Sequence, residues 1–507
     1  MILEILSMLI VFAAGCMFVR TFDVKGWELP AFGFFAGLSI QVVVGTIQVV
    51  VGLPTHPYLN LSLTLLLSLA WFVICFRRGV DLSFKPIPSV ISIAVIILLV
   101  MFFSNANTVN WHTDSFRYLL AGNLIAGGNY SYVNLGSSII EQRLLAVPII
   151  HAPANLQGEY YLHSVFPLMA LSTVMILAWF LSNGLRGKLN NRLVWQFTAL
   201  GVLLLITNNR FIFHAFYING HLLFATLFLI IAGCSWLLVS DPKINSKFLL
   251  AMQALAIPVL VVTRPEGAIA AGLALLPLLL SSRIAWIKRA IILVVLGVST
   301  LAWQFFVILK HYQAVTMVPV SVSSMLAIGV LAVLAIPLLR WLQLERGAKY
   351  ILATTEVGLW AILLFFTVRP PVSLVGGQVN LFRDSVAATI ENVVYNAGAW
   401  GYSLMVLAFL VVVVIALTDI PDRIFLRFPL TTFIPFSFLL AFLRGSPYRI
   451  GDGDSLNRSW IHIIPLAILF IVSAAATERW GLPRINDKVP GFLKIKQKDP
   501  IDSGFEI

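Results

Sequence analysis

The sequence has few charged residues for its length. They make up 11% of 507 residues, whereas soluble globular domains carry about 25%. Hydrophobic residues reach 59%, and the mean hydropathy is +0.94. This balance excludes a soluble globular protein. It predicts an all-α polytopic membrane protein, because a helix satisfies its own backbone hydrogen bonds in lipid.

Cysteine is also scarce, and recognisable nucleotide motifs are missing. The three cysteines, Cys16, Cys75 and Cys234, all fall inside apolar runs, which excludes a disulfide framework and argues against a thiolate metal site. The sequence contains no HExxH zinc motif, no Walker A loop and no Rossmann glycine fingerprint. It therefore offers no site for a cytosolic nucleotide.

The net charge of +12 raises the question of nucleic-acid binding. The Lys and Arg residues, however, stand in short clusters between apolar runs, as topology determinants do. This pattern favours anchoring of cytoplasmic loops against anionic lipid and no nucleic-acid partner.

Apolar runs of membrane-spanning length fill the chain and predict about fifteen helices, with a range of about 13–15. The first run lacks a basic start and a cleavage site, so it is interpreted as a retained helix rather than a signal peptide. No soluble domain fits between the runs, so 1–507 is one transmembrane domain. The runs lie near 2–19, 31–52, 59–76, 87–103, 162–182, 193–207, 219–239, 248–263, 267–281, 289–309, 318–339, 350–367, 400–418, 428–443 and 459–476.

Basic clusters occupy every second connection, which places those connections in the cytoplasm. The N-terminus is then outside, the basic tail 477–507 is cytoplasmic, and the chain is a multi-pass protein of the inner (plasma) membrane. The longest outward loops are 104–161, 368–399 and 444–460. Nearly all the unusual polar motifs fall on this outward side.

The first polar motif is "TDSFRYLLAGNLIAGG" in the first long loop. Thr113 or Asp114 can cap a helix that ends at Gly127 and Gly128, and its length suits an amphipathic helix lying in the membrane interface. Asp114 is thus an N-cap, a general base, or both. The apolar residues recur at helical spacing: Phe116, Leu119, Leu120, Leu124 and Ile125.

The second motif is "VTRPEG", where Pro265 breaks the helix between Arg264 and Glu266. An ionisable group in the bilayer costs roughly 2.5–3.5 kcal/mol, so such residues usually face a cavity or a partner. The pair either marks an outer turn or has a binding role. In the second case Arg264 binds a phosphate, and Glu266 binds a hydroxyl or a cation.

Two further motifs are less specific. Arg458 in "NRSWIHIIP" is either a snorkelling arginine beside Trp460 or a ligand contact. Asp452 and Asp454 fit an exposed turn better than a calcium loop, because no glutamate follows at loop spacing. In "FYINGHLL", Asn219 and His221 open a helix, where a histidine is either a capping residue or a functional one.

The order of these motifs resembles the integral-membrane glycosyltransferases of the C-type (GT-C) superfold, which include protein mannosyltransferases, aminoarabinose transferases and arabinofuranosyltransferases. "TDSFRYLLAGNLIAGGNYSY" looks like the family's acid-bearing outward loop, with Asp114 at the position of the acid. "VTRPEGAIAAGLALL" is similar to its basic-x-Glu-Gly segment, and "NRSWIHIIPLAILF" to its late Arg-aromatic-Pro segment. The resemblance covers 87–281 well, which makes 1–86 extra N-terminal helices and 282–476 further spans.

The resemblance implies transfer of a sugar from a polyprenyl-phosphate donor to a glycan, lipid or protein acceptor outside the cell, with inversion. Asp114 is then the general base, and Arg264, Arg458 and Arg117 bind the donor phosphate. The implied substrate-binding residues are Glu266, His112, Tyr118, Asn219, His221 and Tyr161.

Asn219 and His221 stand where the family commonly has a second acid, so a divalent cation is doubtful, and no other cofactor is expected. Two other functions remain open. An O-antigen-type polymerase or ligase usually has a longer late outward loop than 368–399. A lipid-linked glycan flippase or transporter is expected to carry ionisable residues near the bilayer midplane and repeated interrupted helices.

Overall fold

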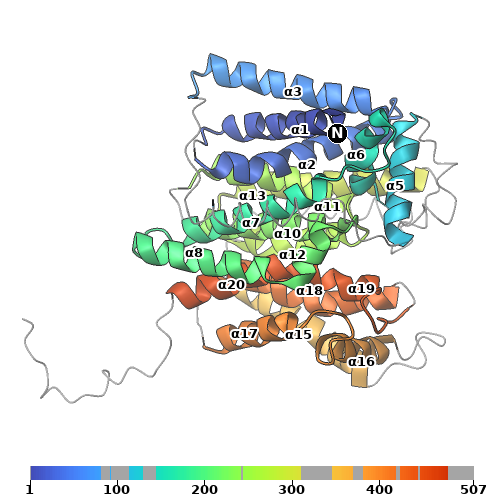
Figure 1. Cartoon of the computed structure of the whole chain (residues 1–507). Coiled ribbons are helices and arrows are strands. Elements are labelled where there is room, and N and C mark those ends of the chain that lie inside the picture. Colours follow the sequence, from blue (N-terminus) through green and yellow to red (C-terminus); the bar gives the residue numbers. More distant parts are fainter. Residues whose placement is uncertain are drawn as a thin grey trace, which may run out of the picture.

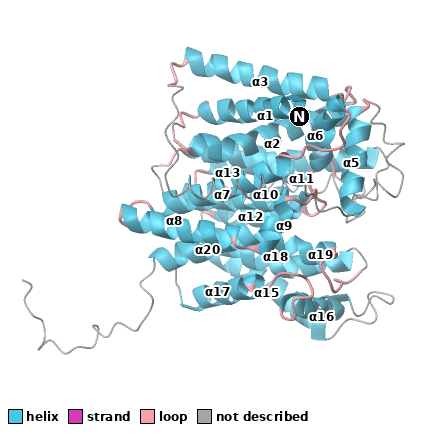
Figure 2. Ribbon diagram, viewed as in Figure 1, coloured by secondary structure: helices cyan, strands magenta, loops and turns pink. Residues whose placement is uncertain are grey.

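The computed structural model describes residues 2–24, 26–81, 92, 113–128, 144–240, 244–309, 345–368, 381–417, 423–443 and 446–477. Within these ranges the chain is helical and forms no strand (Figure 2). The elements are α1 (Ile2–Arg20), α2 (Glu28–Val51), α3 (Pro57–Arg77), α5 (Thr113–Ala126), α6 (Ala146–His151), η2 (Ala152–Gln157), α7 (Val165–Leu185), α8 (Asn191–Ile206), α9 (Asn209–Ala215), α10 (Gly220–Ser240), α11 (Ser246–Val261), α12 (Gly267–Leu280), α13 (Trp286–Leu309), α15 (Glu345–Val368), α16 (Leu381–Val393), α17 (Ser403–Leu417), α18 (Ile424–Leu443), α19 (Ser455–Arg458), η5 (Ser459–Ile463) and α20 (Ile464–Thr477).

The helices confirm a polytopic membrane protein. Among the described residues, nine are long and apolar enough to cross a membrane, and α8 with α9 forms a further candidate bent by 69°. The shorter apolar helices α11, α12 and α17 occupy three more predicted spans. Apart from residue 92, the predicted spans 87–103 and 318–339 lie outside the described residues, so the count of fifteen stays a prediction.

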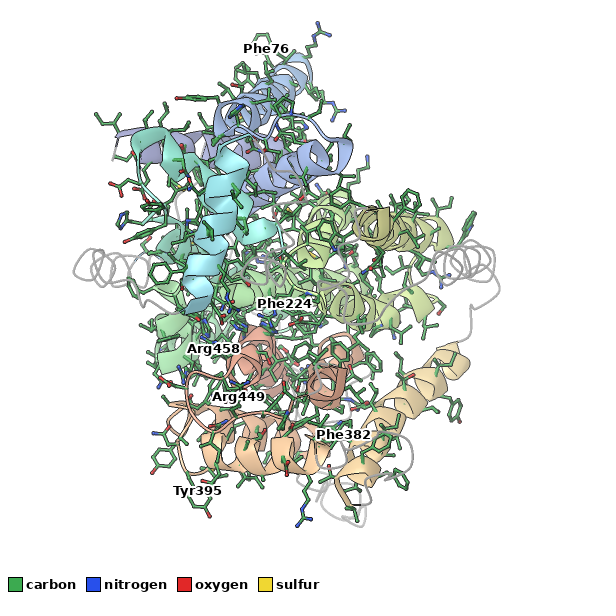
Figure 3. All side chains as sticks on the ribbon, turned by 90° about the vertical axis from the view of Figure 1, so that its right-hand side faces the viewer. Phe76, Phe224, Phe382, Tyr395, Arg449 and Arg458 are labelled. Carbon is green, nitrogen blue, oxygen red and sulfur yellow. The ribbon has the colours of Figure 1, made fainter. Side chains whose placement is uncertain are left out.

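The long helices lie side by side, and α5 runs across one end of them (Figure 1). Helix α10 lies at the centre, with 94% of its apolar stretch buried, and it contacts α7, α11, α12, α18 and α20. Helix α3 lies at the edge, with 28% buried, and exposes Leu66, Phe72 and Phe76. Phe76 is labelled at the top of Figure 3. An exposed apolar face on an outer helix suits contact with lipid.

Three connections between the predicted spans contain helices. Helix α9 lies between the spans 193–207 and 219–239, α16 lies in the outward loop 368–399, and α19 lies in the outward loop 444–460 and continues into η5. Local polar groups explain why α9 forms: the side chain of Asn208 accepts a hydrogen bond from the Phe211 amide and caps the helix. These segments are therefore ordered connections that hold side chains at the end of the bundle.

The predicted helix in the first long loop is present as α5, and Gly128 follows its end with φ +71°. Both Thr113 and Asp114 lie in its first turn rather than before it. Leu119 and Ile125 are buried, whereas Phe116 and Leu120 are exposed one turn apart. The apolar residues of α5 thus lie on two faces. One face packs against the protein, and the other is available to the membrane interface.

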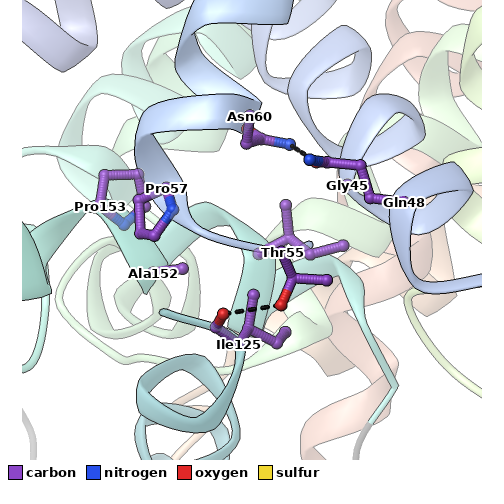
Figure 4. A pocket seen from close by; sticks show the side chains of 9 residues that line it. Gly45, Gln48, Thr55, Pro57, Asn60, Ile125, Ala152 and Pro153 are labelled. Carbon is purple, nitrogen blue, oxygen red and sulfur yellow. Dashed lines mark hydrogen bonds between the residues drawn. The ribbon is translucent and has the colours of Figure 1, made fainter. Parts of the chain in front are cut away.

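Both ends of α5 are fixed. Near its start, Ser115 Oγ donates to the Ile218 carbonyl at 3.1 Å. Near its end, Thr55 Oγ1 donates to the Ile125 carbonyl at 2.8 Å, beside a small pocket whose polar wall includes Asn60 and Gln48 (Figure 4). These bonds set the position of Asp114 relative to α10.

Helices α1 and α2 approach closely through glycine. A Cβ on Gly15 would lie 1.7 Å from the Gly33 carbonyl oxygen, so the backbones leave no room for a side chain. Small residues at such crossings let transmembrane helices pack closely. Gly15→Ala is therefore expected to lower the thermal unfolding midpoint in detergent, with a destabilisation of about 1–3 kcal/mol. Gly272→Ala, where nothing lies within 4 Å of the added Cβ, is the control and should match the wild type.

Candidate functional site

Four segments far apart in the sequence meet at the end of the bundle crossed by α5. They are the first turn of α5, the connection from α9 to α10, the turn between α11 and α12, and α19 with η5. Figure 3 shows Arg458 between α5 and the C-terminal helices, with Phe224 of α10 nearby. We refer to the side chains gathered here as the Asp114–Arg458 site: Asp114, Tyr217, His221, Arg264, Glu266, Arg458 and His462.

An ion pair joins the first and last of these segments. Arg458 Nη2 lies 3.1 Å from Asp114 Oδ2, and the two residues are 344 positions apart in the chain. The Asp114 side chain is 15% exposed and that of Arg458 only 2%. A buried arginine thus fixes a carboxylate that solvent or a substrate can still reach.

The rest of the Arg458 guanidinium is also engaged. Nη1 donates to the Tyr217 hydroxyl, and Nε donates to the Asp454 carbonyl at 3.3 Å. The guanidinium carbon also lies 5.1 Å from the centre of the Tyr217 ring, a cation–π distance. With all three nitrogens held, Arg458 has one orientation, and Asp114 is oriented with it.

A second ion pair lies in the turn between α11 and α12. Arg264 Nε donates to Glu266 Oε1, and Glu266 is fully buried. Arg264 Nη1 lies 3.4 Å from His221 Nε2. The Arg264 side chain is 14% exposed, so it is the more accessible of the two arginines.

Two histidines, His221 and His462, extend the polar contacts of Arg264 into the bundle. Because Arg264 has only donors, Nε2 of His221 must accept, and a neutral His221 then carries its proton on Nδ1. That nitrogen lies 3.0 Å from Nε2 of His462, which it supplies with a hydrogen bond. The His462 ring in turn stacks on Phe224 at 3.9 Å between centroids. A series of hydrogen bonds thus runs from Glu266 through Arg264 and His221 to His462. Glu266 and His221 fix the position of Arg264.

Several buried polar atoms at this place have no hydrogen-bond partner among the described residues. Buried polar groups in folded proteins are nearly always hydrogen-bonded, so a cluster of exceptions points to water or to a ligand. His214 belongs to the cluster because its ring lies 5.3 Å from that of His221. The atoms are Glu266 Oε2, His214 Nδ1 and Nε2, His462 Nδ1 and Asn219 Oδ1.

The charges at the site affect two groups outside the spans. Burial raises the pKa of the Tyr217 hydroxyl although Arg458 opposes the rise, so Tyr217 is neutral at physiological pH. Burial disfavours the charge on Arg264, but Glu266, Tyr118 and Asp114 outweigh it and raise the pKa of the guanidinium. Arg264 is therefore a permanent cation.

The other sequence-predicted residues fall into four groups. Tyr118 and Asn219 are buried beside the site, and Asn219 Nδ2 lies 3.4 Å from the Tyr217 hydroxyl. Arg117 is partly exposed on α5, three residues after Asp114. Tyr161 lies before α7, and its ring contacts that of His163 with 4.2 Å between the centroids. His112 lies outside the described residues.

Sequence reasoning missed Tyr217, His214 and His462. Tyr217 and His214 fall in the connection between the predicted spans 193–207 and 219–239, and His462 falls at the outer start of the predicted span 459–476. The predicted side, shared with Asp114, was the available signal. Nothing in the local pattern separates these residues from interfacial aromatics. Only the folded contacts do so.

Tyr217→Phe is expected to destabilise the protein by about 1.5–3 kcal/mol, because Arg458 Nη1 loses its partner while remaining buried. The same change loosens Arg458 and, through it, Asp114. Thermal unfolding in detergent measures the first effect. Tyr402→Phe, at an exposed tyrosine, is the matched control and should leave the midpoint unchanged.

Within the described residues, no group of three or more His, Cys, Asp and Glu side chains is placed to hold a metal ion. Comparison with known proteins adds no assignment: no protein family, no curated protein and no solved structure matches the chain.

Proposed function

We propose that the chain is a membrane glycosyltransferase that moves a sugar from a polyprenyl-phosphate donor to an acceptor hydroxyl on the extracytoplasmic side. The observation that carries the proposal is the Asp114–Arg458 ion pair beside Arg264. It combines an accessible carboxylate, an accessible permanent cation and unsatisfied buried polar atoms at one end of an apolar bundle. General-base transfer from a lipid phosphate requires a base and a phosphate-binding cation.

In the proposed step, Asp114 takes the proton of the acceptor hydroxyl as its oxygen bonds to the anomeric carbon. The bond from that carbon to the phosphate oxygen breaks, and its electron pair leaves with polyprenyl phosphate. Arg264 stabilises the charge that develops on the phosphate. Arg458, which is buried and fully engaged, holds Asp114 in position.

The roles of the remaining residues follow from their positions in the site. His221 and Glu266 hold Arg264 through its two engaged nitrogens. Tyr118 and Asn219, beside the ion pairs, contact the sugar or the acceptor. Arg117, on the exposed part of α5, is a further contact for the lipid phosphate.

Polymerase or ligase chemistry also transfers glycans without nucleotides and stays a second candidate of the same reaction type. A flippase or transporter is less favoured, because Asp114, Arg264 and Arg458 lie at helix ends and in turns rather than in mid-helix. Transport sites in membrane proteins usually lie near the bilayer midplane.

The proposal is tested with the full chain purified in nanodiscs and a radiolabelled polyprenyl-phosphate sugar. Added membrane extract supplies the acceptor, and chromatography follows the label and the release of polyprenyl phosphate. Label should move from the lipid-linked donor into acceptor material, and a nucleotide sugar should not serve as donor. No transfer from any polyprenyl-phosphate sugar, or flipping of an intact lipid-linked glycan, would argue against it.

A further inference from the structure

The end of the bundle remote from Asp114 contains a second cavity. A cleft of about 740 Å³ opens between the α1–α2 connection, the end of α3 and the start of α11. Its volume falls within the range of about 300–1,000 Å³ that is usual for ligand pockets. Helix α11 leads from this cleft to the turn of Arg264, and its 16 residues separate the two places by about 24 Å.

The charged lining of the cleft is mainly basic. Arg78 and Lys247 line it from two different elements, and Asp23 is the acid among its lining residues. Lys288 lies at the same place, since its Nζ donates to Ser246 Oγ at 2.9 Å. Beneath them, Arg20 is buried and donates from Nη1 to the Val24 carbonyl at 2.7 Å. Two cations and one carboxylate therefore line the described part of the cleft, and Lys288 and Arg20 add positive charge next to it, which favours an anion.

Part of the wall is apolar and continues onto the lipid-facing surface. Phe22, Trp71 and Ile74 line the cleft, and Ile74 is 39% exposed on α3. The neighbouring outer face of α3 exposes Phe72 and Phe76. A ligand with a phosphate group and a hydrocarbon chain fits this combination: the phosphate lies against the cations and the chain along α3.

We propose that the cleft binds the headgroup of an anionic phospholipid. The phosphate group lies between Arg78 and Lys247, the Ser246 hydroxyl donates a hydrogen bond to it, and the acyl chains follow α3. The site is separate from the Asp114–Arg458 site and does not depend on the reaction proposed there.

The test is native mass spectrometry of the detergent-purified full chain with added phosphatidylglycerol or phosphatidylcholine of matched acyl chains. The wild type should retain phosphatidylglycerol in preference to phosphatidylcholine. Arg78→Gln with Lys247→Gln should weaken phosphatidylglycerol binding by about thirtyfold, given about fivefold (about 1 kcal/mol) for each basic residue near an anionic headgroup. Asp23→Asn should strengthen it, and Asn tolerates the φ of +57° at this position.

Arg186→Gln with Arg192→Gln is the matched control, since it removes the same charge from exposed positions at the end of α7 and the start of α8. Its affinity for phosphatidylglycerol should stay within about twofold of the wild type. Equal weakening in both double variants would overturn the proposal in favour of general charge attraction. Full displacement of the lipid by millimolar inorganic phosphate would assign the cleft to free phosphate instead. Weaker binding in Asp23→Asn would contradict the charge argument even if the double variant failed to fold.

Discussion

Replacing Asp114 with Asn is expected to lower the rate of sugar transfer by about 10²–10⁴-fold, the usual contribution of a general base. Asn has the shape of Asp, and its side-chain oxygen can still accept the hydrogen bond from Arg458 Nη2. It cannot take a proton from an acceptor hydroxyl. The fold should therefore survive while the chemical step fails, with kcat reduced and donor binding retained.

Asp452→Asn is the matched control, because Asp452 is an exposed acid in the neighbouring turn. It should transfer sugar at the rate of the wild type. A folded Asp114→Asn protein with an unchanged kcat would remove Asp114 from the mechanism and leave it as a helix-end residue paired with Arg458.

Removing Arg264 has the largest expected effect on stability. Glu266 is fully buried and pairs with Arg264, so Arg264→Ala leaves a buried carboxylate without its cation. Breaking one side of a buried ion pair costs about 3–5 kcal/mol. The thermal unfolding midpoint in detergent should fall, and Nε2 of His221 loses the hydrogen bond that Arg264 donates to it.

The double variant Arg264→Ala with Glu266→Gln separates stability from function. It removes the uncompensated charge, so much of the stability should return. Activity should not return, because the cation assigned to the donor phosphate is still missing. Recovery of both stability and transfer would make Arg264 and Glu266 a purely structural pair.

Much of the fold could be predicted from the sequence, because the length of each apolar run indicates whether it can form a membrane-spanning helix. Helix α5 and its end at Gly127 and Gly128 also followed from apolar spacing and turn residues. The short elements α9 and α19, of 7 and 4 residues, were not predicted, since they are too short for a periodic pattern.

The site was predicted as a set of residues but not as a set of contacts. Charge alternation put Asp114, Arg264 and Arg458 on one side, and the structure brings them to one end of the bundle. The pairing of Asp114 with Arg458 joins positions 344 residues apart, and no local pattern specifies which arginine an acid will meet. Arg458 was expected to bind phosphate, but its burial and its three engaged nitrogens favour positioning of Asp114.

The central claim is that Asp114 serves sugar transfer to a cell-envelope acceptor. The most direct measurement compares envelope glycans, glycolipids and glycoproteins by mass spectrometry in cells lacking the gene and in cells complemented with the wild type or Asp114→Asn. The account predicts that one sugar disappears from an envelope component without the gene, returns with the wild type, and stays absent with an equally abundant Asp114→Asn protein. Identical glycans in all strains, or full restoration by Asp114→Asn, would contradict it.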